Sequence, residues 1–359
     1  MVMFINFRRI SKQINEEYII RTSFSVILVI VSIFLVCKPA AATVLYENSF
    51  DDKPDWVSPS QASGLATTHS TAKILGFSGY RATNNIGEAL FYIDSNGARG
   101  SSGKGLTIWR ETVTENSWRG GSLDINIQDP DIVWKNTPNP NGYDELYIAF
   151  WCKWSAGWNW GSSFYLEKTF RVYTNDSYQA HYNNNASLSS SEVPGTTTQK
   201  EAYLIMDRYD PNRKDMYYTC RVQTGNDVQV ADTDFSWNTW VGDGNWHHIE
   251  FHVKLNDAGA SNLIAECYID GIKRSELPSP VMLRNGTDRL ITSVILFDNI
   301  QCRTTSVFEQ AQFVDDIVIS TTRIGPDYVI GSSTSSPQPP TPDTVPPSAP
   351  SGVSIQINQ

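Results

Sequence analysis

The sequence predicts an all-β fold, a jelly-roll β-sandwich that extends from residue 43 to residue 330. Short runs rich in Val, Ile, Tyr, Trp and Phe alternate with Gly, Asn, Asp and Pro, and no long run has helical periodicity. Nine or more predicted strands in one continuous domain are too many for an immunoglobulin-like domain and are typical of a jelly roll. The clearest predicted strands are 105–111, 146–154, 169–173, 203–207, 217–223, 246–255, 265–270, 290–298 and 313–320.

Residues 1–42 are predicted to be a secretory signal peptide. A basic lead is followed by an apolar run at 24–36 and by small residues at 40–42, which is the order of a cleavable signal. The apolar run is shorter than the ~20 residues of a membrane-spanning helix. We therefore expect a secreted protein, extracellular or periplasmic, without a membrane partner after cleavage. An uncleaved signal anchor is the alternative.

The segment 331–359 is predicted to be a Pro/Ser-rich linker, because seven prolines follow a serine-rich stretch in it. Ala349–Val353 resembles the opening of a fibronectin type III module, so a truncated start of such a module is the alternative interpretation of this segment.

Asp270–Gly271 predicts a tight hairpin, since glycine readily adopts the positive φ that a two-residue turn requires.

The net charge limits the expected binding partners, and the cysteine content limits the possible disulfides. The net charge of −10 offers no counterion release on nucleic acid, which is therefore excluded as an expected partner. Signal cleavage would leave four cysteines, Cys152, Cys220, Cys267 and Cys302. Export permits two disulfides among them, and free buried thiols are the alternative.

Three segments carry a resemblance to a known superfamily. Residues 243–250 (DGNWHHIE), 266–271 (ECYIDG) and 313–320 (FVDDIVIS) resemble, in the right order, strands of the concanavalin A-like lectin/glucanase superfamily. Its laminin-G-like and polysaccharide-lyase-like secreted members are the most similar. The resemblance implies the fold, but it leaves the activity open, because lectins, glycosidases, lyases and adhesion modules share that fold. The catalytic Glu-x-Asp-x-(x)-Glu strand of family 16 glycosidases is absent.

Strand alternation gives the candidate site. Between residues 246 and 254, Ile249, Phe251 and Val253 predict one buried face, and the polar residues predict the other. The strands at 146–154, 169–173 and 217–223 alternate in the same way. We expect these strands to share the hollow side of one sheet, where a glycan would lie. The predicted groove residues are Tyr147, Trp151, Arg171, Tyr173, Arg221, His248, Glu250, His252 and Lys254.

This residue set suits sugars, because aromatic rings stack on their C–H faces and Arg, Glu and His supply hydrogen bonds. The first functional hypothesis is a lectin-like domain that binds an extracellular polysaccharide in a concave groove. The alternative is a polysaccharide lyase that cleaves a uronate-containing glycan by β-elimination. Arg171, or Arg221, would then neutralise the carboxylate, and Tyr173 or His248 would remove the proton. An adhesion domain with a protein partner is a third interpretation.

No cofactor is required by either hypothesis, but the resemblance implies a structural Ca²⁺ between an N-terminal acidic residue and the last strand. Glu47 and Asp315 are the predicted ligands, and ordinary surface acidity is the alternative. Among the clustered tryptophans, Trp154 is predicted to lie in the core. Trp158 and Trp160, in a Gly-flanked turn, are predicted to form a sugar platform.

Overall fold

The computed structural model consists of two units, residues 1–42 and 43–359, and only parts of the second are described. The described residues are 43–58, 75–81, 89–110, 122–158, 166–174, 200–207, 215–222, 226–236, 240–276, 290–301 and 310–331. The predicted signal peptide and nearly all of the predicted linker lie outside these ranges and stay predictions. Within them, no helix is long and apolar enough to cross a membrane.

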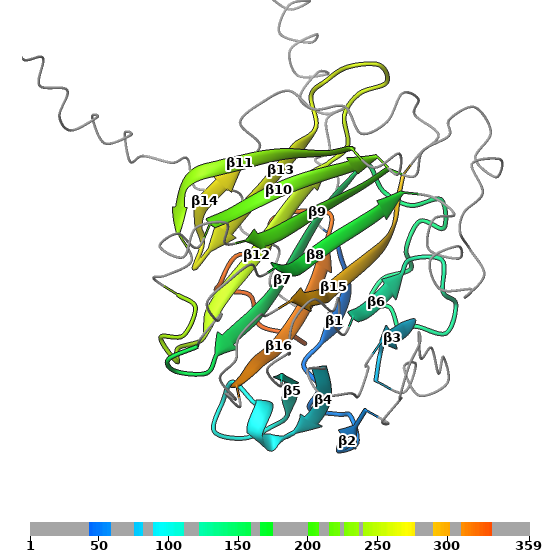
Figure 1. The fold of residues 1–359 in the computed structure, drawn as a ribbon. Coiled ribbons are helices and arrows are strands. Elements are labelled where there is room, and N and C mark those ends of the chain that lie inside the picture. Colours follow the sequence, from blue (N-terminus) through cyan, green and yellow to red (C-terminus); the bar gives the residue numbers. More distant parts are fainter. Residues whose placement is uncertain are drawn as a thin grey trace, which may run out of the picture. The chain divides into compact units, whose positions relative to one another are not determined.

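Two antiparallel sheets face each other and form the predicted jelly-roll sandwich, which the structure confirms (Figure 1). Sheet A runs in the order β14 (Ile272–Glu276), β13 (Ile264–Ile269), β12 (His247–Lys254), β7 (Glu145–Trp154), β16 (Gln310–Ser320), β5 (Gly105–Arg110), β4 (Ala89–Asp94) and β2 (Trp56–Val57), with β1 (Val44–Asn48) paired to β16. Sheet B runs in the order β11 (Asn226–Ser236), β10 (Asp215–Val222), β9 (Lys200–Asp207), β8 (Leu166–Thr174), β15 (Ile291–Gln301), β6 (Ser122–Asn126) and β3 (Gly79–Arg81). One 3₁₀ turn, η1 (Ser95–Gly97), follows β4.

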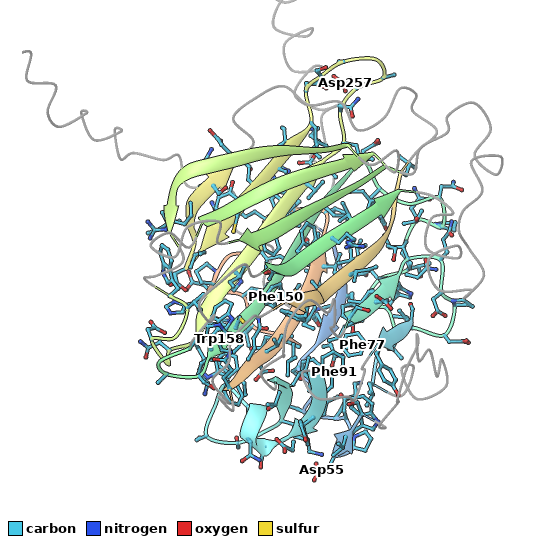
Figure 2. The ribbon with its side chains drawn as sticks, in the orientation of Figure 1. Asp55, Phe77, Phe91, Phe150, Trp158 and Asp257 are labelled. Atoms are coloured by element: carbon cyan, nitrogen blue, oxygen red, sulfur yellow. The ribbon has the colours of Figure 1, made fainter. Side chains whose placement is uncertain are left out.

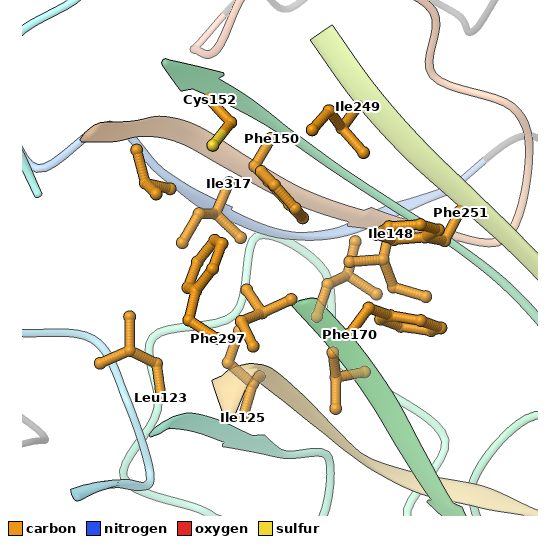
Figure 3. Close-up of a cluster of buried hydrophobic side chains, with 14 of the residues drawn as sticks. Leu123, Ile125, Ile148, Phe150, Cys152, Phe170, Ile249, Phe251, Phe297 and Ile317 are labelled. Carbon is orange, nitrogen blue, oxygen red and sulfur yellow. The ribbon is translucent and has the colours of Figure 1, made fainter. Parts of the chain in front are cut away.

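The core lies between the sheets and is built by alternate residues of each strand. Phe170 of β8 stacks on Phe251 of β12 at 4.6 Å between ring centroids, and Phe150 of β7 meets Phe297 of β15 edge-on at 5.1 Å. Figure 3 shows these rings meeting from the two sides, and Figure 2 shows Phe77 and Phe91 among the side chains that extend the core toward β3 and β4. Each buried Phe contributes about 1.5–3 kcal/mol of transfer free energy.

The hairpin between β13 and β14 has the predicted two-residue turn. Asp270 has a φ of 53° and Gly271 a φ of 79°, the left-handed pair that a type I′ turn requires. The carboxylate of Asp270 accepts a hydrogen bond from the backbone N–H of His248 at 2.9 Å, which ties the turn to the start of β12.

Residues 321–330, here called the C-terminal strap, follow β16 and cover part of the outward face of sheet A. The backbone N–H of Thr321 donates to the carbonyl of Thr43 at 3.0 Å. Beyond it, the strap packs apolar side chains on outward residues of β1, β7 and β16. The residues in this contact are Val44, Tyr147, Ala149, Val318, Ile324, Tyr328 and Ile330.

Two of the four cysteines are settled by the described residues. Cys152 and Cys267 are both fully buried, and Cys267 is a free thiol. The alternative with two disulfides is therefore wrong, while the side chains of Cys220 and Cys302 lie outside the description.

Trp154 is fully buried, which confirms its predicted place in the core. Trp158 is 5% exposed and also belongs to the core, so the predicted sugar platform is wrong for this residue. Trp160 lies outside the described residues.

Candidate functional site

The predicted groove residues are divided between the two sheets, so the prediction that they share one groove is wrong. Tyr147 and Trp151 of β7 lie in sheet A, together with His248, Glu250, His252 and Lys254 of β12. Arg171 and Tyr173 of β8 lie in sheet B, as does Arg221 of β10. Because Phe170 and Phe251 meet in the core, the residues that alternate with them on β8 and β12 face opposite sides of the sandwich.

Glu250 lies beneath the C-terminal strap and not in an open groove. Its side chain is fully buried, and its carboxylate accepts hydrogen bonds from the backbone N–H groups of Ile324 at 2.6 Å and Gly325 at 3.1 Å. Burial raises the pKa of Glu250, and these two hydrogen bonds oppose the shift. Glu250 thus holds the strap against sheet A, which is a structural role.

His252 is the centre of a hydrogen-bond network close to Glu250. Its two ring nitrogens lie 2.7 Å from Glu266 and 2.8 Å from Glu145, and its ring stacks on Tyr147 at 4.1 Å. Lys254 pairs with Glu145 at 3.1 Å. Burial by itself would raise the pKa of Glu266, but the hydrogen bonds from His252 and Tyr268 outweigh it and lower that pKa to about 2. The network occupies the polar groups that the predicted groove would offer to a sugar.

His248 is also enclosed. It is 3% exposed, and its ring meets the edge of Trp151 at 5.4 Å. Burial lowers the pKa of His248 to about 4, although the nearby Asp270 acts in the opposite direction. The predicted partnership of His248 with Arg171 is wrong, because the two residues lie on different sheets.

On the outward face of sheet B, Arg171 and Asp124 flank one strand. Ile295 of β15 pairs with Arg171 of β8 on one side and with Asp124 of β6 on the other. Both charged residues are buried, at 4% and 0% exposure. Their neighbours Phe170 and Leu123 belong to the core, so alternation directs Arg171 and Asp124 away from it.

A second row of polar positions runs beside the first. Ser293 of β15 pairs with Tyr173 of β8 and with Asn126 of β6. The Oγ of Ser293 and the Oγ1 of Thr169 are buried without a hydrogen-bond partner in the part of the chain that the structure describes. The Oδ1 of Asn126 accepts a hydrogen bond from the backbone N–H of Gln128 at 2.9 Å, and the amide Nδ2 of Asn126 takes no part in this bond. Buried polar groups of this kind call for a polar partner.

We call these residues (Asp124, Asn126, Thr169, Arg171 and Ser293) the sheet-B patch. Of its members, the sequence pointed only to Arg171 as a site residue. A signal for Asp124 and Asn126 was present, since Ser122–Asn126 alternates polar and apolar residues as a half-buried strand does. The side chains of Tyr173 and Arg221 lie outside the description, so only the strand positions of these two residues are known.

Glu47 and Asp315 do not fit the predicted calcium site. The carboxylate of Glu47 pairs with Lys135 at 2.6 Å and accepts from the hydroxyl of Tyr328. The two oxygens of Asp315 accept from the backbone N–H groups of Arg99 and Asp316, both at 2.8 Å. Calcium takes six to eight oxygens, and no group of three or more His, Cys, Asp or Glu among the described residues is placed to hold a metal ion.

No protein-family model matches the chain, and no curated protein matches it. Several solved structures are similar. A variant of the alginate lyase Aly36B in complex with an alginate trisaccharide has 10% identity and a TM-score of 0.46, covering 78% of this chain and 99% of its own. The endo-β-1,4-glucuronan lyase of the fungus Trichoderma reesei has 15% identity and a TM-score of 0.41, covering 75% and 100%. The alginate lyase of Aplysia kurodai has 12% identity and a TM-score of 0.39, covering 74% and 98%. At these identities and scores, substrate and chemistry have to be argued from the residues of this chain.

Proposed function

We propose that the protein is a polysaccharide lyase that binds a uronate-containing glycan on the sheet-B patch and cleaves it by β-elimination. The observation that carries the proposal is the position of Arg171. This side chain is 4% exposed on a face that points away from the core. A guanidinium in such a place is suited to a planar anion, because its fork of N–H groups matches a carboxylate in a bidentate pair.

The chemistry requires that the carboxylate of the uronate be neutralised before the C5 proton can leave. Arg171 would bind that carboxylate, and the amide Nδ2 of Asn126 would donate a second hydrogen bond to it. Both donors would stabilise the negative charge that spreads onto the carboxylate in the transition state. Asn126 lies on β6 and Arg171 on β8, the two strands that flank β15, so the carboxylate would lie over β15 between these two donors.

Tyr173 is the proposed base, since it stands two residues from Arg171 on β8 and is the register partner of Ser293. Its phenolic oxygen would take the C5 proton, the C4–O glycosidic bond would break, and a C4=C5 double bond would form. The proton would then pass to the leaving glycosidic oxygen, which balances the reaction without a further reactant. His248, the other predicted base, lies on the opposite sheet. A protein exported by the predicted signal peptide would meet such polysaccharides outside the cell.

Glycan binding without cleavage is the second candidate. It is favoured by the hydroxyl groups of Thr169 and Ser293, which have no hydrogen-bond partner among the described residues. Hydroxyl groups of this kind recognise a ligand by hydrogen bonding and supply neither a base nor a charge.

The test is to incubate the protein with alginate, glucuronan, polygalacturonate and heparin and to follow the ultraviolet absorbance of the unsaturated product. We expect absorbance to rise with at least one polymer and Arg171→Lys to abolish most of the rise. Arg274→Lys, the same change on β14 of sheet A, is the matched control. Saturable binding without any absorbance change would select the second candidate and reject the lyase.

A further inference from the structure

The outward face of sheet A carries an aromatic surface that the strap does not cover. Lys153 of β7 lies between two rings, with its Nζ 5.0 Å from the ring centroid of Trp246 and 4.4 Å from that of Phe313. The two rings are 6.5 Å apart and meet at 60°. All three side chains are partly exposed, whereas the strap packs on Val44, Ala149 and Val318.

The register extends this surface into a row across the sheet. Phe313 of β16 pairs with Lys153 on one side and with Thr107 of β5 on the other, and Thr107 pairs with Tyr92 of β4. These four adjacent strands at the usual spacing make the row about 14 Å long. Trp151 is two residues from Lys153 on β7, and the guanidinium of Arg99 lies 4.3 Å from its ring centroid. We call these residues (Tyr92, Trp151, Lys153, Trp246 and Phe313) the sheet-A strip.

The charge of Lys153 sets the strip apart. Arg99 pairs with Asp316 at 2.7 Å and Lys254 pairs with Glu145 at 3.1 Å, whereas Arg274 of β14 lies over the ring of Trp240 without a carboxylate partner among the described residues. Lys153 has cation–π contacts with the two aromatic rings and no carboxylate partner among the described residues. Burial lowers its pKa. In a chain with a net charge of −10, an uncompensated cation between aromatic rings is complementary to an anion with apolar faces.

We propose that the sheet-A strip is an accessory binding surface for an acidic polysaccharide, on the opposite side of the sandwich from the sheet-B patch. The C–H faces of the sugar rings would lie on Trp246 and Phe313, and Lys153 would pair with a uronate carboxylate. The ligand class rests on the proposed function, whereas the site itself rests on the rings and the charge of the strip. Such a surface would keep the protein on its polymer between cleavage events and thereby raise its local concentration there.

The test is affinity electrophoresis in native gels that contain alginate, polygalacturonate or neutral glucomannan. All proteins carry Arg171→Lys, so that the sheet-B patch neither cleaves the polymer nor dominates its binding. We expect retardation in at least one acidic gel, and we expect Lys153→Met and Trp246→Ala each to raise the dissociation constant about tenfold. Lys153→Met keeps the apolar stem and removes only the charge. Lys273→Met, on β14 of the same sheet, is the matched control and should leave retardation unchanged.

Equal retardation of Lys153→Met and its parent would overturn the proposal, as would equal retardation in the neutral and acidic gels. Trp246→Phe keeps an aromatic ring and is the second variant if Trp246→Ala fails to fold, which near-ultraviolet circular dichroism reports. Failure of the proposed function has a different signature. In that case the protein without Arg171→Lys cleaves none of the polymers, yet Lys153→Met still loses retardation.

Discussion

Arg171 and His252 face opposite sides of the sandwich, although they neighbour two rings that touch. Phe170 precedes Arg171 on β8, Phe251 precedes His252 on β12, and the two rings stack at 4.6 Å across the core. Because successive side chains of a strand point to opposite faces, Arg171 lies on the outer face of sheet B and His252 on the outer face of sheet A. The outward face of sheet A is covered by the strap around Glu250, and the outward face of sheet B carries the sheet-B patch.

Replacing Asn126 by Asp should reduce cleavage without disturbing the fold. Aspartate has the same shape and keeps the oxygen that accepts from the N–H of Gln128, but it puts a negative charge where the substrate carboxylate would bind. We expect kcat/KM to fall about 10–100-fold, which corresponds to the loss of a charge-assisted hydrogen bond. Steady-state kinetics on the best uronate polymer measure the effect. Unchanged kinetics would remove Asn126 from the site.

Replacing His252 by Phe should destabilise the protein by about 3 kcal/mol at pH 7, because both charge-assisted hydrogen bonds to Glu145 and Glu266 are lost while the stacking on Tyr147 is kept. The wild-type pKa of Glu266 is lowered to about 2 from a reference of 4.5. The contribution of Glu266 to stability is therefore present above about pH 4.5 and is lost as the pH falls toward 2. Urea unfolding from pH 2 to 7 should show the difference between the two proteins narrowing at the acidic end, and a constant difference would contradict the network.

The contribution of Glu250 to stability should depend on pH in the opposite direction to that of Glu266. Because burial raises the pKa of Glu250 in the folded state, the folded protein holds a proton that the unfolded chain releases. Stability from this group is thus present below the reference pKa of 4.5 and is lost as the pH rises through the folded value. The side chain of the Glu250→Gln variant does not ionise. The free energy of unfolding of this variant, relative to that of the wild type, should therefore increase from pH 4 to pH 7. Parallel curves would show that the carboxylate does not titrate under the strap.

Most strands could be predicted from the sequence, because alternation and turn chemistry are local. The inward residues of β12 (Ile249, Phe251 and Val253) are all buried, as their spacing indicates. Asp270–Gly271 forms the expected turn because its positive φ angles are a property of those two residues. Both features depend only on neighbours along the chain.

The candidate site could be predicted only in part, because alternation shows which residues of a strand share a face but not which sheet the strand joins. Arg171 and His248 alternate in the same way, yet β8 and β12 pair with different partners. The strap is the second reason. Glu250 looks like a solvent-facing residue until residues 324 and 325 place their N–H groups on it.

The most direct test of the account is a crystal structure of the Tyr173→Phe variant with a bound uronate oligosaccharide, since this change removes the proposed base and keeps the proposed carboxylate site. We expect a sugar carboxylate within hydrogen-bonding distance of the Arg171 guanidinium and of the Asn126 amide. A sugar bound at His248, Glu250 and His252 without contact to Arg171 would contradict it.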